Sequence, residues 1–488
     1  MDDQLKIFKA YDVRGLVPDE LDERKARAIG WSFARLCMGT GGIGPSVAST
    51  TPAQPLPPPL SPAGVAPEDS QFSRSLVIAR DMRQSGDGLA SQFAAGAMAA
   101  GMNVVDMGMA STDMLYFVSG HLDMPAAMFT ASHNPAAYNG IKLCYRGARP
   151  VGQETGLALV KEMAQEALAH GSDGGKETPG THLERIDMMA EYVDHVLSFV
   201  DVGTLRELVV VADVANGMGG MVVPEVFSKL PLKLHMLYPE LDGSFPNHPA
   251  DPIQEENLAD LKRAVINMHA DIGLAFDGDA DRVFLVDENA QPVSGSVTTA
   301  LVATRMLSKF PGSTILYNII CSKAVPETII AMGGVPVRTR VGHSFIKKVM
   351  AETGAVFGGE HSGHYYFRDN YRADSGLIAA LIILELMSVS SSSLSELLEP
   401  FRQYKSSGEI NTKVDNPAGV VAAVAARLSD SGVQCDLTDG LTVDYGGWWF
   451  NLRPSNTEPL LRLNVETSGE LEIGTCVDMV KHLIEEVS

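Results

Sequence analysis

Short apolar runs alternate with stretches of helical periodicity along most of this sequence. The apolar run at residues 76–79 is followed by an alanine-rich helical pattern at 91–100, and the run at 208–212 is followed by a glycine-rich turn and another helical pattern. A third run, at 315–320, precedes a helical pattern and a strand-like segment at 335–337. Alternating strands and helices predict α/β units built on mixed, mostly parallel sheets. The similar length of the three blocks predicts three topologically similar domains.

The end of the chain has a different pattern. Two strand-like segments, 440–445 and 448–452, flank a Gly-Gly turn, a third lies at 460–465, and a helical pattern occupies 474–487. These segments predict a small antiparallel sheet with helices, that is, a C-terminal α+β domain. The four expected domains are residues 1–183, 184–291, 292–402 and 403–488.

Residues 39–67 interrupt the first block and are rich in Pro, Ala, Ser and Gly. A segment of this composition buries too little apolar surface to become ordered by itself. We expect a disordered or polyproline-like surface loop inside the first domain, in preference to a recognition motif.

Composition and charge narrow the classes of partner and compartment. The 488-residue chain has a net charge of -22, which argues against binding to nucleic acid or to anionic membrane surfaces. Five scattered cysteines without a C-x-x-C pair fit a reducing compartment, and the N-terminal residues lack the order of a secretory signal. The longest apolar stretch, 377–387, is too short to span a bilayer. We therefore expect a cytoplasmic protein, monomeric or weakly homo-oligomeric, whose partner is a small molecule.

Three aspartates, Asp277, Asp279 and Asp281, alternate with glycine and alanine directly after the apolar run at 272–276. Hard divalent cations such as Mg²⁺ prefer carboxylate oxygens, and the small spacers let three carboxylates turn toward one ion. Because the apolar run is typical of a buried strand, the carboxylates follow its C-terminal end, where the ligand sites of α/β folds lie. The segment therefore predicts a metal site.

Two other interpretations of this segment are weaker. An EF-hand loop would use Glu288 as its last ligand, but Arg282 stands where such a loop needs glycine, and a strand-like run follows at 283–286. A plain solvated turn would leave three carboxylates repelling one another without a cation.

Ser132 lies in the segment 130–135, after a strand-like run at 126–130. Serine, asparagine and proline also make ordinary turns, so the segment alone does not decide between a turn and a site. A serine hydroxyl is a poor nucleophile unless a nearby cation, or a phosphate already carried on its oxygen, changes its chemistry. Lys142 follows in the sequence and could neutralise a phosphate or move a proton. If Ser132 meets the carboxylates in space, the pair suits phosphoryl transfer between serine and another hydroxyl.

Two further loops carry polar groups in glycine- or proline-bounded segments. Residues 453–459 offer a guanidinium, two hydroxyls and an amide, a good phosphate cradle, although such loops are as often ordinary turns. Residues 358–364 place a carboxylate and a hydroxyl among glycines, which suits the grip of a sugar diol. His343 and His364 lie in loops, where a structural role is equally open. The sequence has no G-x-x-x-x-G-K-[ST] and no complete dinucleotide-binding fingerprint.

Together these segments resemble the α-D-phosphohexomutase family and, within it, the bacterial phosphomannomutase/phosphoglucomutase group. The similar segments appear in the family's order and cover nearly the whole chain: 11–15, 130–135, 277–282, 359–364 and 453–459. The resemblance implies four domains around a central active-site cleft, the first three of them alike.

The resemblance also implies a role for each candidate residue. Ser132 would carry the phosphoryl group and would bind Mg²⁺ together with Asp277, Asp279 and Asp281. Glu360 and Ser362 would hold sugar hydroxyls. The phosphate that does not react would be held by Arg453, Ser455, Asn456 and Thr457. The cleft would also contain the substrate contact Tyr11 and the catalytic candidates Arg14, His133, Lys142, Arg282, His343 and His364, with Lys142 and the histidines as candidates for proton transfer.

Two departures from the family pattern stand out. Ile320 occupies the place just before Cys321 where many members carry a basic residue, and Lys323 follows slightly later. The insertion at 39–67 is the second departure, and we assign it no role.

The expected function is the interconversion of hexose 6-phosphate and hexose 1-phosphate through a phosphoserine enzyme and a hexose 1,6-bisphosphate intermediate. If Glu360 and Ser362 hold the 3- and 4-hydroxyls, they do not contact C2, where glucose and mannose differ, so we expect both sugars as substrates and name mannose as the first choice. The alternatives are a phosphoglucosamine mutase, a metal-dependent sugar-phosphate phosphatase and a catalytically silent sugar-phosphate-binding protein.

Overall fold

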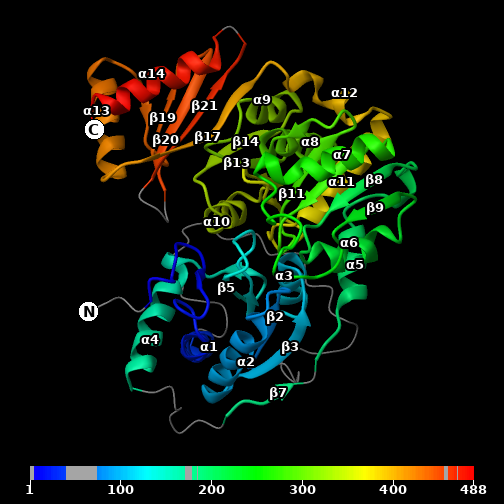
Figure 1. Cartoon of the computed structure of the whole chain (residues 1–488), viewed down its shortest axis with the longest axis vertical. Coiled ribbons are helices and arrows are strands. Elements are labelled where there is room, and N and C mark those ends of the chain that lie inside the picture. Colours follow the sequence, from blue (N-terminus) through cyan, green and yellow to red (C-terminus); the bar gives the residue numbers. More distant parts are fainter. Residues whose placement is uncertain are drawn as a thin grey trace.

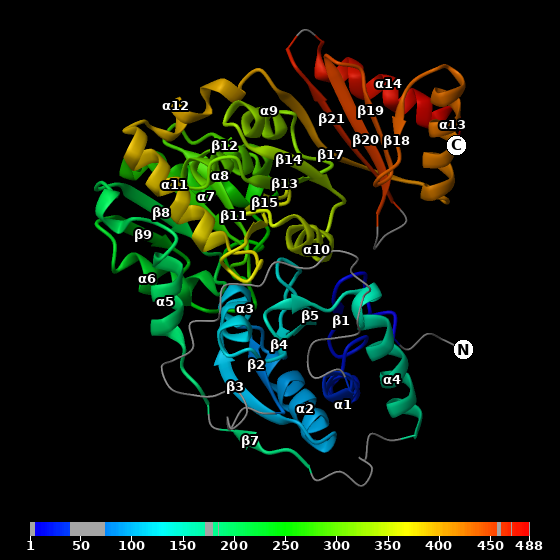
Figure 2. The same cartoon turned by 180° about the vertical axis from the view of Figure 1, so that it is seen from behind.

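Four β-sheets with helices packed against them follow one another along the chain in the computed structural model (Figure 1). The structure describes residues 5–39, 74–170, 179–183, 185–455, 460–469 and 471–487. The first sheet forms the lower part of the molecule, and the second, third and fourth sheets lie above it, with the third in the middle (Figures 1 and 2). The predicted insertion at 39–67 lies outside the described residues, apart from Gly39.

The first sheet has the strand order β1-β5-β4-β2-β3-β7, with β6 paired to β5. Its strands are β1 (Val13–Leu16), β2 (Ser75–Arg80), β3 (Asn103–Met109), β4 (Ala126–Phe129), β5 (Tyr138–Tyr145), β6 (Arg149–Pro150) and β7 (His182–Leu183). Its helices are α1 (Glu23–Gly39), α2 (Gly86–Ala99), α3 (Thr112–His121) and α4 (Leu157–His170). Successive side chains of β2 point to opposite faces, so Ile78 joins the core under α1 and α2 while Val77 joins the core on the α3 side.

The second and third sheets continue the alternation of strands and helices. The second sheet contains β8 (Val209–Asp213), β9 (Lys233–Leu237), β10 (Ile272–Phe276), β11 (Val283–Asp287) and β12 (Pro292–Val293), with α5 (Met189–Leu197), α6 (Gly219–Phe227) and α7 (Ala259–Met268). The third contains β13 (Thr314–Asn318), β14 (Val335–Thr339), β15 (Phe357–Gly359) and β16 (Tyr365–Phe367), with α8 (Gly295–Lys309), α9 (Ala324–Ala331), α10 (His343–Thr353), α11 (Gly376–Ser390) and α12 (Leu394–Leu398). The short 3₁₀ helices are Gln153–Thr155, Val202–Thr204, Glu255–Leu258 and Glu399–Phe401.

These three sheets share one topology. Their central strands run in the orders β3-β2-β4-β5, β9-β8-β10-β11 and β14-β13-β15-β16. In each, the first three strands are parallel and the fourth returns antiparallel to the third. The prediction of three topologically similar α/β domains with mixed sheets is confirmed. The exact boundaries stay a prediction, and β12 pairs with β11, so the second sheet extends to Val293.

The C-terminal sheet is antiparallel throughout, in the order β17-β21-β20-β19-β18. Its strands are β17 (Lys405–Lys413), β18 (Cys435–Asp436), β19 (Leu441–Asp444), β20 (Trp448–Pro454) and β21 (Leu460–Thr467), and its helices are α13 (Pro417–Asp430) and α14 (Ile473–Glu485). The α+β prediction is confirmed, and the sequence pattern found three of the five strands. Both helices pack on one face with Phe450 and Leu452, so the alternate residues of β20, Asn451 and Arg453, belong to the other face.

The hydrophobic cores are not divided one to a sheet. One continuous core contains Val77 of the first sheet, Val210 of the second and Leu381 of α11, whereas the C-terminal sheet has its own core around Phe450. Helix α11, which contains the longest apolar stretch, is almost wholly buried in the shared core. Among the described residues no single helix is long and apolar enough to cross a membrane; only α11 taken together with Leu394–Phe401 meets that test by length and composition, and this pair is bent by 96°.

Candidate active site

The candidate loops occupy the same place in the three related sheets, the turn between the third and the fourth strand. Residues 130–137, the serine loop, join β4 to β5. Residues 277–282, the metal loop, join β10 to β11, and residues 360–364, the sugar loop, join β15 to β16. The metal loop and the sugar loop touch through a backbone bridge between Arg282 and His364. Because the three sheets repeat one topology, three loops far apart in sequence arrive at one place.

Ser132 lies in the turn after β4 with a backbone angle φ of +48°, in the left-handed region. Its backbone N–H donates to Thr130 Oγ1 at 2.9 Å, which helps to hold this uncommon conformation. Its side chain is nearly buried, and the hydroxyl donates to Asp277 Oδ2 at 2.7 Å. A hydroxyl of the first sheet therefore reaches the carboxylates of the second, which are 145 residues away in the sequence.

The metal loop is tightly folded against Ser132. A side chain at Gly278 would place its Cβ 2.5 Å from the Ser132 carbonyl oxygen, so only glycine allows this approach. Ala280 adopts a positive φ of +62°, and its N–H donates to the Asp277 carbonyl at 3.1 Å. This turn brings together oxygens of Asp277, Asp279 and Asp281 that all lie within 4.8 Å of one another, with the three side chains fully buried.

The carboxylate cluster has the chemistry of a divalent-cation site. Asp279 Oδ1 and Asp281 Oδ1 are buried and have no hydrogen-bond partner. Buried charged oxygens without a partner are costly, and three carboxylates at this spacing repel one another, so a cation would remove both costs. Carboxylate oxygens are the ligands that Mg²⁺ prefers, and the donor set fits such an ion. Glu288, which an EF-hand would require, instead accepts hydrogen bonds from Ser395 and takes no part in the cluster.

Two donors hold the other sides of the carboxylates. Lys142 Nζ lies 2.7 Å from both Asp279 Oδ2 and Asp281 Oδ2. Burial alone would lower the pKa of Lys142, but these two carboxylates raise it well above its ordinary value. Thr112 donates its hydroxyl to Asp279 Oδ2 at 2.5 Å and its backbone N–H to the Asp279 carbonyl at 3.0 Å. Oδ2 of Asp279 is thus fully occupied, which leaves Oδ1 for another partner.

Arg282 closes the cluster on the serine side. Its Nε donates to Asp277 Oδ2 at 2.9 Å, and its Nη2 lies 3.3 Å from Ser132 Oγ and 2.6 Å from His133 Nδ1. Because a guanidinium only donates, His133 Nδ1 must accept and carries no proton. Burial, followed by the charge of Arg282, lowers the pKa of His133 well below its ordinary value, so the ring is neutral. Burial raises the pKa of Asp277 to about 8, although Arg282 opposes the shift.

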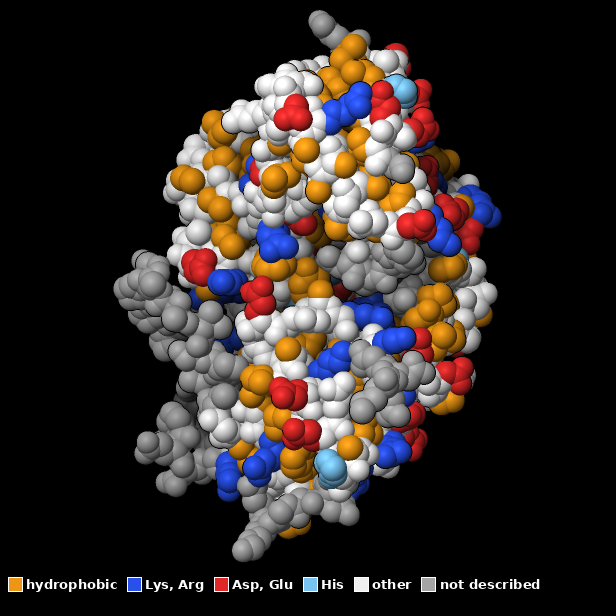
Figure 3. All heavy atoms as spheres, turned by 90° about the vertical axis from the view of Figure 1, so that its left-hand side faces the viewer, with side chains coloured by type: hydrophobic (Ala, Val, Ile, Leu, Met, Phe, Trp, Pro, Cys, Tyr) orange, Lys and Arg blue, Asp and Glu red, His pale blue; other side chains and the backbone are white. Residues whose placement is uncertain are grey.

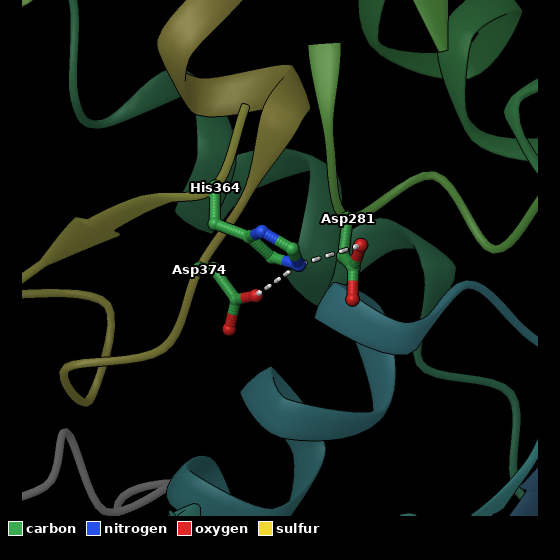
Figure 4. A group of neighbouring side chains, drawn as sticks. All are labelled: Asp281, His364 and Asp374. Carbon is green, nitrogen blue, oxygen red and sulfur yellow. Dashed lines mark ion pairs between the residues drawn. The ribbon is translucent and has the colours of Figure 1, made fainter. Parts of the chain in front are cut away.

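His364 connects the metal loop to the third sheet. Figure 4 shows its ring between Asp281 and Asp374, with Nε2 3.9 Å from a carboxylate oxygen of each. These three side chains form a second group of potential metal ligands, which shares Asp281 with the first. Asp374 also pairs with the buried Lys347 at 3.1 Å. Lys347 and Asp374 have no counterpart among the predicted site residues.

The sugar loop presents Glu360 and Ser362 next to His364. The Glu360 side chain is almost fully buried, and its oxygens accept hydrogen bonds from Asn318 Nδ2, the Gly342 backbone N–H and the Tyr366 hydroxyl, at 3.1, 3.0 and 2.7 Å. Ser362 Oγ lies 3.1 Å from His364 Nδ1. Both carboxylate oxygens of Glu360 therefore already have partners within the protein.

Tyr11, Arg14 and His343 lie at the edge of this group. The Tyr11 hydroxyl donates to the Val341 carbonyl at 3.1 Å, and its ring packs edge-on against His343 at a centroid distance of 5.2 Å. Burial, with Lys347 as the next cause, lowers the pKa of His343 to about 3. Arg14 donates to Asn134 Oδ1 and to Asp12 Oδ2, both at 2.6 Å. Arg14 thus supports the serine loop from the first sheet.

The C-terminal sheet contributes Arg453 from the face opposite its helices. Arg453 is 5% exposed and pairs with Glu409 of β17 at 3.1 Å. Burial and the carboxylates of Glu360 and Asp439 raise the pKa of Tyr11 to about 12, and the charge of Arg453 opposes this shift. Val341, whose carbonyl accepts from Tyr11, donates its N–H to Asp439 Oδ2 at 2.9 Å, so segments next to the first, third and C-terminal sheets meet here. Ser455 donates its N–H to Leu460 O at 2.8 Å, whereas Asn456 and Thr457 lie outside the described residues.

Ile320 stands where many members of the family carry a basic residue, and the structure shows what occupies this place. Ile320 is 7% exposed and supplies no charge. Lys323 Nζ binds Asp444 Oδ1 at 2.7 Å and the Gly446 carbonyl at 2.8 Å, so it joins the third sheet to the C-terminal sheet. The nearby lysine therefore forms an interdomain contact.

Several buried polar residues of the site were missing from the sequence prediction. Asp113, next to Thr112, accepts hydrogen bonds from Ser111 Oγ (2.5 Å), the Tyr192 hydroxyl (2.7 Å) and Ser375 Oγ (2.8 Å). The first turn of α3 thus contacts the second sheet through Thr112 and the N-terminus of α11 through Ser375. Arg83, three residues after the end of β2, donates hydrogen bonds to the backbone of the serine loop. Figure 3 shows Lys and Arg side chains gathered across the middle of one face, between the upper and lower parts of the molecule.

Three repeated α/β sheets and a fourth α+β sheet bring a serine hydroxyl, a carboxylate cluster suited to a divalent cation and several cationic side chains together. This fold and this set of groups are those expected of a phosphoryl-transfer enzyme of the phosphohexomutase class. Four family models match in order: phosphoglucomutase/phosphomannomutase α/β/α domain I at residues 62–170, domain II at 190–291, domain III at 294–404 and the C-terminal domain at 409–483.

Individual proteins give the same result. The chain is 39% identical to the phosphohexose mutases of Xanthomonas campestris and 35% identical to the phosphomannomutase of Escherichia coli, over 96% of each chain in both cases. The crystal structure of a phosphoglucomutase/phosphomannomutase family protein from Burkholderia thailandensis matches with a TM-score of 0.83 and 28% identity, covering 100% of this chain and 98% of that one. The chain belongs to the phosphoglucomutase/phosphomannomutase family and is an intramolecular phosphotransferase.

Proposed function

We propose that this enzyme interconverts hexose 6-phosphate and hexose 1-phosphate through a phosphoserine at Ser132. The observation that carries the proposal is the 2.7 Å hydrogen bond from Ser132 Oγ to Asp277 within a buried cluster of three carboxylates. Phospho-Ser132 gives its phosphoryl group to the free hydroxyl of the substrate, which forms the hexose 1,6-bisphosphate. The bisphosphate then turns over, and its other phosphate returns to Ser132.

Asp277, Asp279 and Asp281, together with the oxygen on Ser132, would hold Mg²⁺. The unpartnered Oδ1 atoms of Asp279 and Asp281 support this assignment. When bound, the ion would offset negative charge on the phosphoryl oxygens. Arg282, which reaches Ser132 Oγ and Asp277 from the other side, supplies a second positive charge at the same oxygens.

For proton transfer, we assign Lys142 as the acid that protonates the sugar oxygen when the second phosphoryl group returns to Ser132; the neutral amine left by that step accepts the proton of the next attacking hydroxyl. The charged state favoured by Asp279 and Asp281 supports its role as an acid. His133 is less suited, because its Nδ1 already accepts from Arg282. His343 and His364 would line the remaining space around the sugar, and Arg14 would steady the serine loop through Asn134.

The sugar hydroxyls and the phosphate that does not react would be bound by separate loops. Glu360 and Ser362 would bind the 3- and 4-hydroxyls, so C2 is not distinguished and both mannose and glucose are accepted, with mannose as our first choice. The names of the relatives, phosphomannomutase and phosphohexose mutase, support this order. The other phosphate would be held by Arg453, Ser455, Asn456 and Thr457, and Tyr11 would contact the substrate between them. A phosphoglucosamine mutase and a metal-dependent sugar-phosphate phosphatase remain the competing readings.

The test combines intact mass with a primed assay. The protein is incubated with glucose 1,6-bisphosphate and Mg²⁺, and isomer formation and inorganic phosphate are measured with the 6-phosphates of mannose, glucose and glucosamine. The proposal expects one phosphate on Ser132, isomer exchange without net phosphate release, and the highest kcat/KM for mannose or glucose. Net phosphate release would indicate a phosphatase, and preference for glucosamine would indicate the phosphoglucosamine enzyme.

The matched variants are Ser132→Ala and Ser32→Ala. Ser132→Ala should lose phosphate incorporation and lower kcat by at least about 10³-fold, equivalent to about 4 kcal/mol of activation free energy. Ser32 is a buried serine of α1 whose hydroxyl donates to the Ala28 carbonyl at 2.8 Å, so Ser32→Ala should keep wild-type turnover. Wild-type turnover in Ser132→Ala would refute the assigned nucleophile.

A further inference from the structure

Arg83 lies just after the C-terminal end of β2 and is 3% exposed. Its Nε donates to Asp81 Oδ2 at 3.2 Å, and its backbone N–H donates to Asp81 Oδ1 at 3.0 Å. Both side chains of this ion pair are nearly inaccessible to solvent. A buried pair of this kind could be purely structural, so the remaining donors of the guanidinium decide what Arg83 does.

The other donors of Arg83 go to the backbone of the serine loop and of Tyr138, the first residue of β5. Nη2 donates to the carbonyl oxygens of Ser132 at 2.8 Å and Asn134 at 2.7 Å. Nη1 donates to those of Pro135 at 2.9 Å and Tyr138 at 3.0 Å. With the bond to Asp81, all five N–H groups of the guanidinium are used. One side chain therefore collects four carbonyl oxygens from a seven-residue segment.

This arrangement fixes the direction of the loop dipoles. The Ser132 carbonyl points at Arg83, whereas the Ser132 hydroxyl bonds to Asp277. The negative ends of four peptide dipoles are thus neutralised by a cation and are kept from turning toward an anionic group on Ser132. The same bonds hold the left-handed backbone of Ser132, a conformation that is unfavourable for a non-glycine residue when nothing stabilises it.

Arg83 is also held from the second domain. Its guanidinium carbon lies 5.1 Å from the centre of the Phe245 ring, a cation–π contact. The backbone at Gly243 approaches so closely that a Cβ there would lie 2.6 Å from the Arg83 Cα. The segment after β9 therefore packs directly against Arg83. Because Arg83 binds the serine loop, this packing fixes the loop relative to both domains that form the metal site.

We propose that Arg83 is a positioning residue for phosphoryl transfer. It holds the serine loop so that Ser132 Oγ points at the carboxylate cluster and the loop carbonyls point away from the transferring phosphate. The proposal rests on the function proposed for Ser132. Lysine cannot replace the planar fork, because an ammonium carries three donors from one point and cannot span four carbonyls and a carboxylate.

The experiment compares Arg83→Lys and Arg83→Met with Arg305→Lys. Arg305 is partly exposed and binds the buried Glu385 at 2.9 Å, away from the candidate loops, so Arg305→Lys is a control for an arginine that holds a buried carboxylate elsewhere. For each protein we would measure the thermal unfolding midpoint, kcat and KM in the primed assay, and the rate of Ser132 phosphorylation by glucose 1,6-bisphosphate, followed by intact mass. The fraction of folded protein is matched before rates are compared.

Arg83→Lys should lower kcat and the rate of Ser132 phosphorylation by about 10- to 100-fold, as expected for a displaced nucleophile, while KM stays within about twofold. Arg305→Lys should lower the unfolding midpoint and leave kcat unchanged. If Arg83→Lys folds and keeps the wild-type kcat and phosphorylation rate, the proposal is overturned. If Arg83→Met folds, its kcat and its rate of Ser132 phosphorylation should be lower than those of Arg83→Lys. If Arg83→Met does not fold, the rates of Arg83→Lys alone test the proposal.

The two proposals fail in different ways. Absence of phosphate on Ser132 in the wild-type enzyme would refute the proposed function. Phosphate on Ser132 in the wild type, with an unaltered rate in Arg83→Lys, would refute only the role of Arg83.

Discussion

Thr112 provides a sharp test of how the carboxylate cluster is prepared for a cation. Its hydroxyl donates to Asp279 Oδ2 at 2.5 Å, and both side chains are fully buried. The replacement Thr112→Val keeps the shape of the side chain and removes only this donor. Asp279 then loses one of the two side-chain donors that hold Oδ2 and thereby orient Oδ1, which has no partner.

The size of the effect follows from the partners of Asp279. A hydrogen bond to a charged group contributes roughly 1.5–3 kcal/mol. Lys142 Nζ also binds Asp279 Oδ2, at 2.7 Å, and remains in the variant, so the loss should be near the lower limit, about 1.5 kcal/mol. If this cost falls on the orientation that binds the ion, the apparent affinity for Mg²⁺ should fall about tenfold.

The assay is a Mg²⁺ titration with two readouts, activation of the primed mutase reaction and the rise of the thermal unfolding midpoint. A ligand at 100 times its dissociation constant stabilises a protein by about 2.7 kcal/mol, so the shift is measurable. Thr112→Ser, which keeps the hydroxyl, should stay within about twofold of the wild type. Thr304→Val removes a helix-internal hydroxyl bond to the Ala300 carbonyl and should leave the Mg²⁺ affinity unchanged. An unaltered Mg²⁺ affinity in Thr112→Val would show that the hydroxyl does not orient Asp279.

Two further predictions concern buried carboxylates. Glu385→Gln removes a fully buried charge that binds Arg305 and Lys309. It should lower the free energy of unfolding by about 2 kcal/mol and leave kcat unchanged. The loss is smaller than for a fully buried pair because the two cations are partly exposed to solvent. Urea denaturation and the primed assay check this, and a lower kcat at equal folded fraction would contradict it. Burial raises the pKa of Asp113 from 3.8 to about 6, against its three hydroxyl donors. Between these values the folded state binds more protons than the unfolded state, so wild-type stability should fall as pH rises through this window, by about 2–3 kcal/mol relative to Asp113→Asn. Thermal unfolding midpoints of both proteins from pH 4 to 7 test this, and parallel profiles would count against the shift.

The fold and part of the site could be predicted because they depend on local pattern. Strand β10 is apolar at every position, and all five residues are buried, so the carboxylates that follow it mark a sheet edge. The pattern failed for β17, whose residues Lys405–Lys413 are mostly polar and largely exposed. That strand lies at the edge of its sheet and is paired only with β21, so it needs no apolar face of its own.

The supporting residues could not be predicted from local pattern, because distant contacts create them. Thr112 and Asp279 are separated by 167 residues, and nothing near Thr112 in the sequence indicates a carboxylate. Arg83 is different, since it lies three residues after β2, whose C-terminal end lies beside that of β4. The rule that selected the metal loop, polar residues at the end of a parallel strand, would also have selected Asp81 and Arg83.

The bond between Asp113 and Ser375 joins residues 262 positions apart. During synthesis on a ribosome, the first domain emerges long before Ser375, and even before Asp279. Until about three quarters of the polypeptide has been made, Asp113 has only Ser111 and Tyr192 as hydroxyl donors, because Ser375 does not yet exist. The hydrogen-bond network behind the carboxylate cluster is therefore completed late, and any product truncated before Ser375 lacks its last donor.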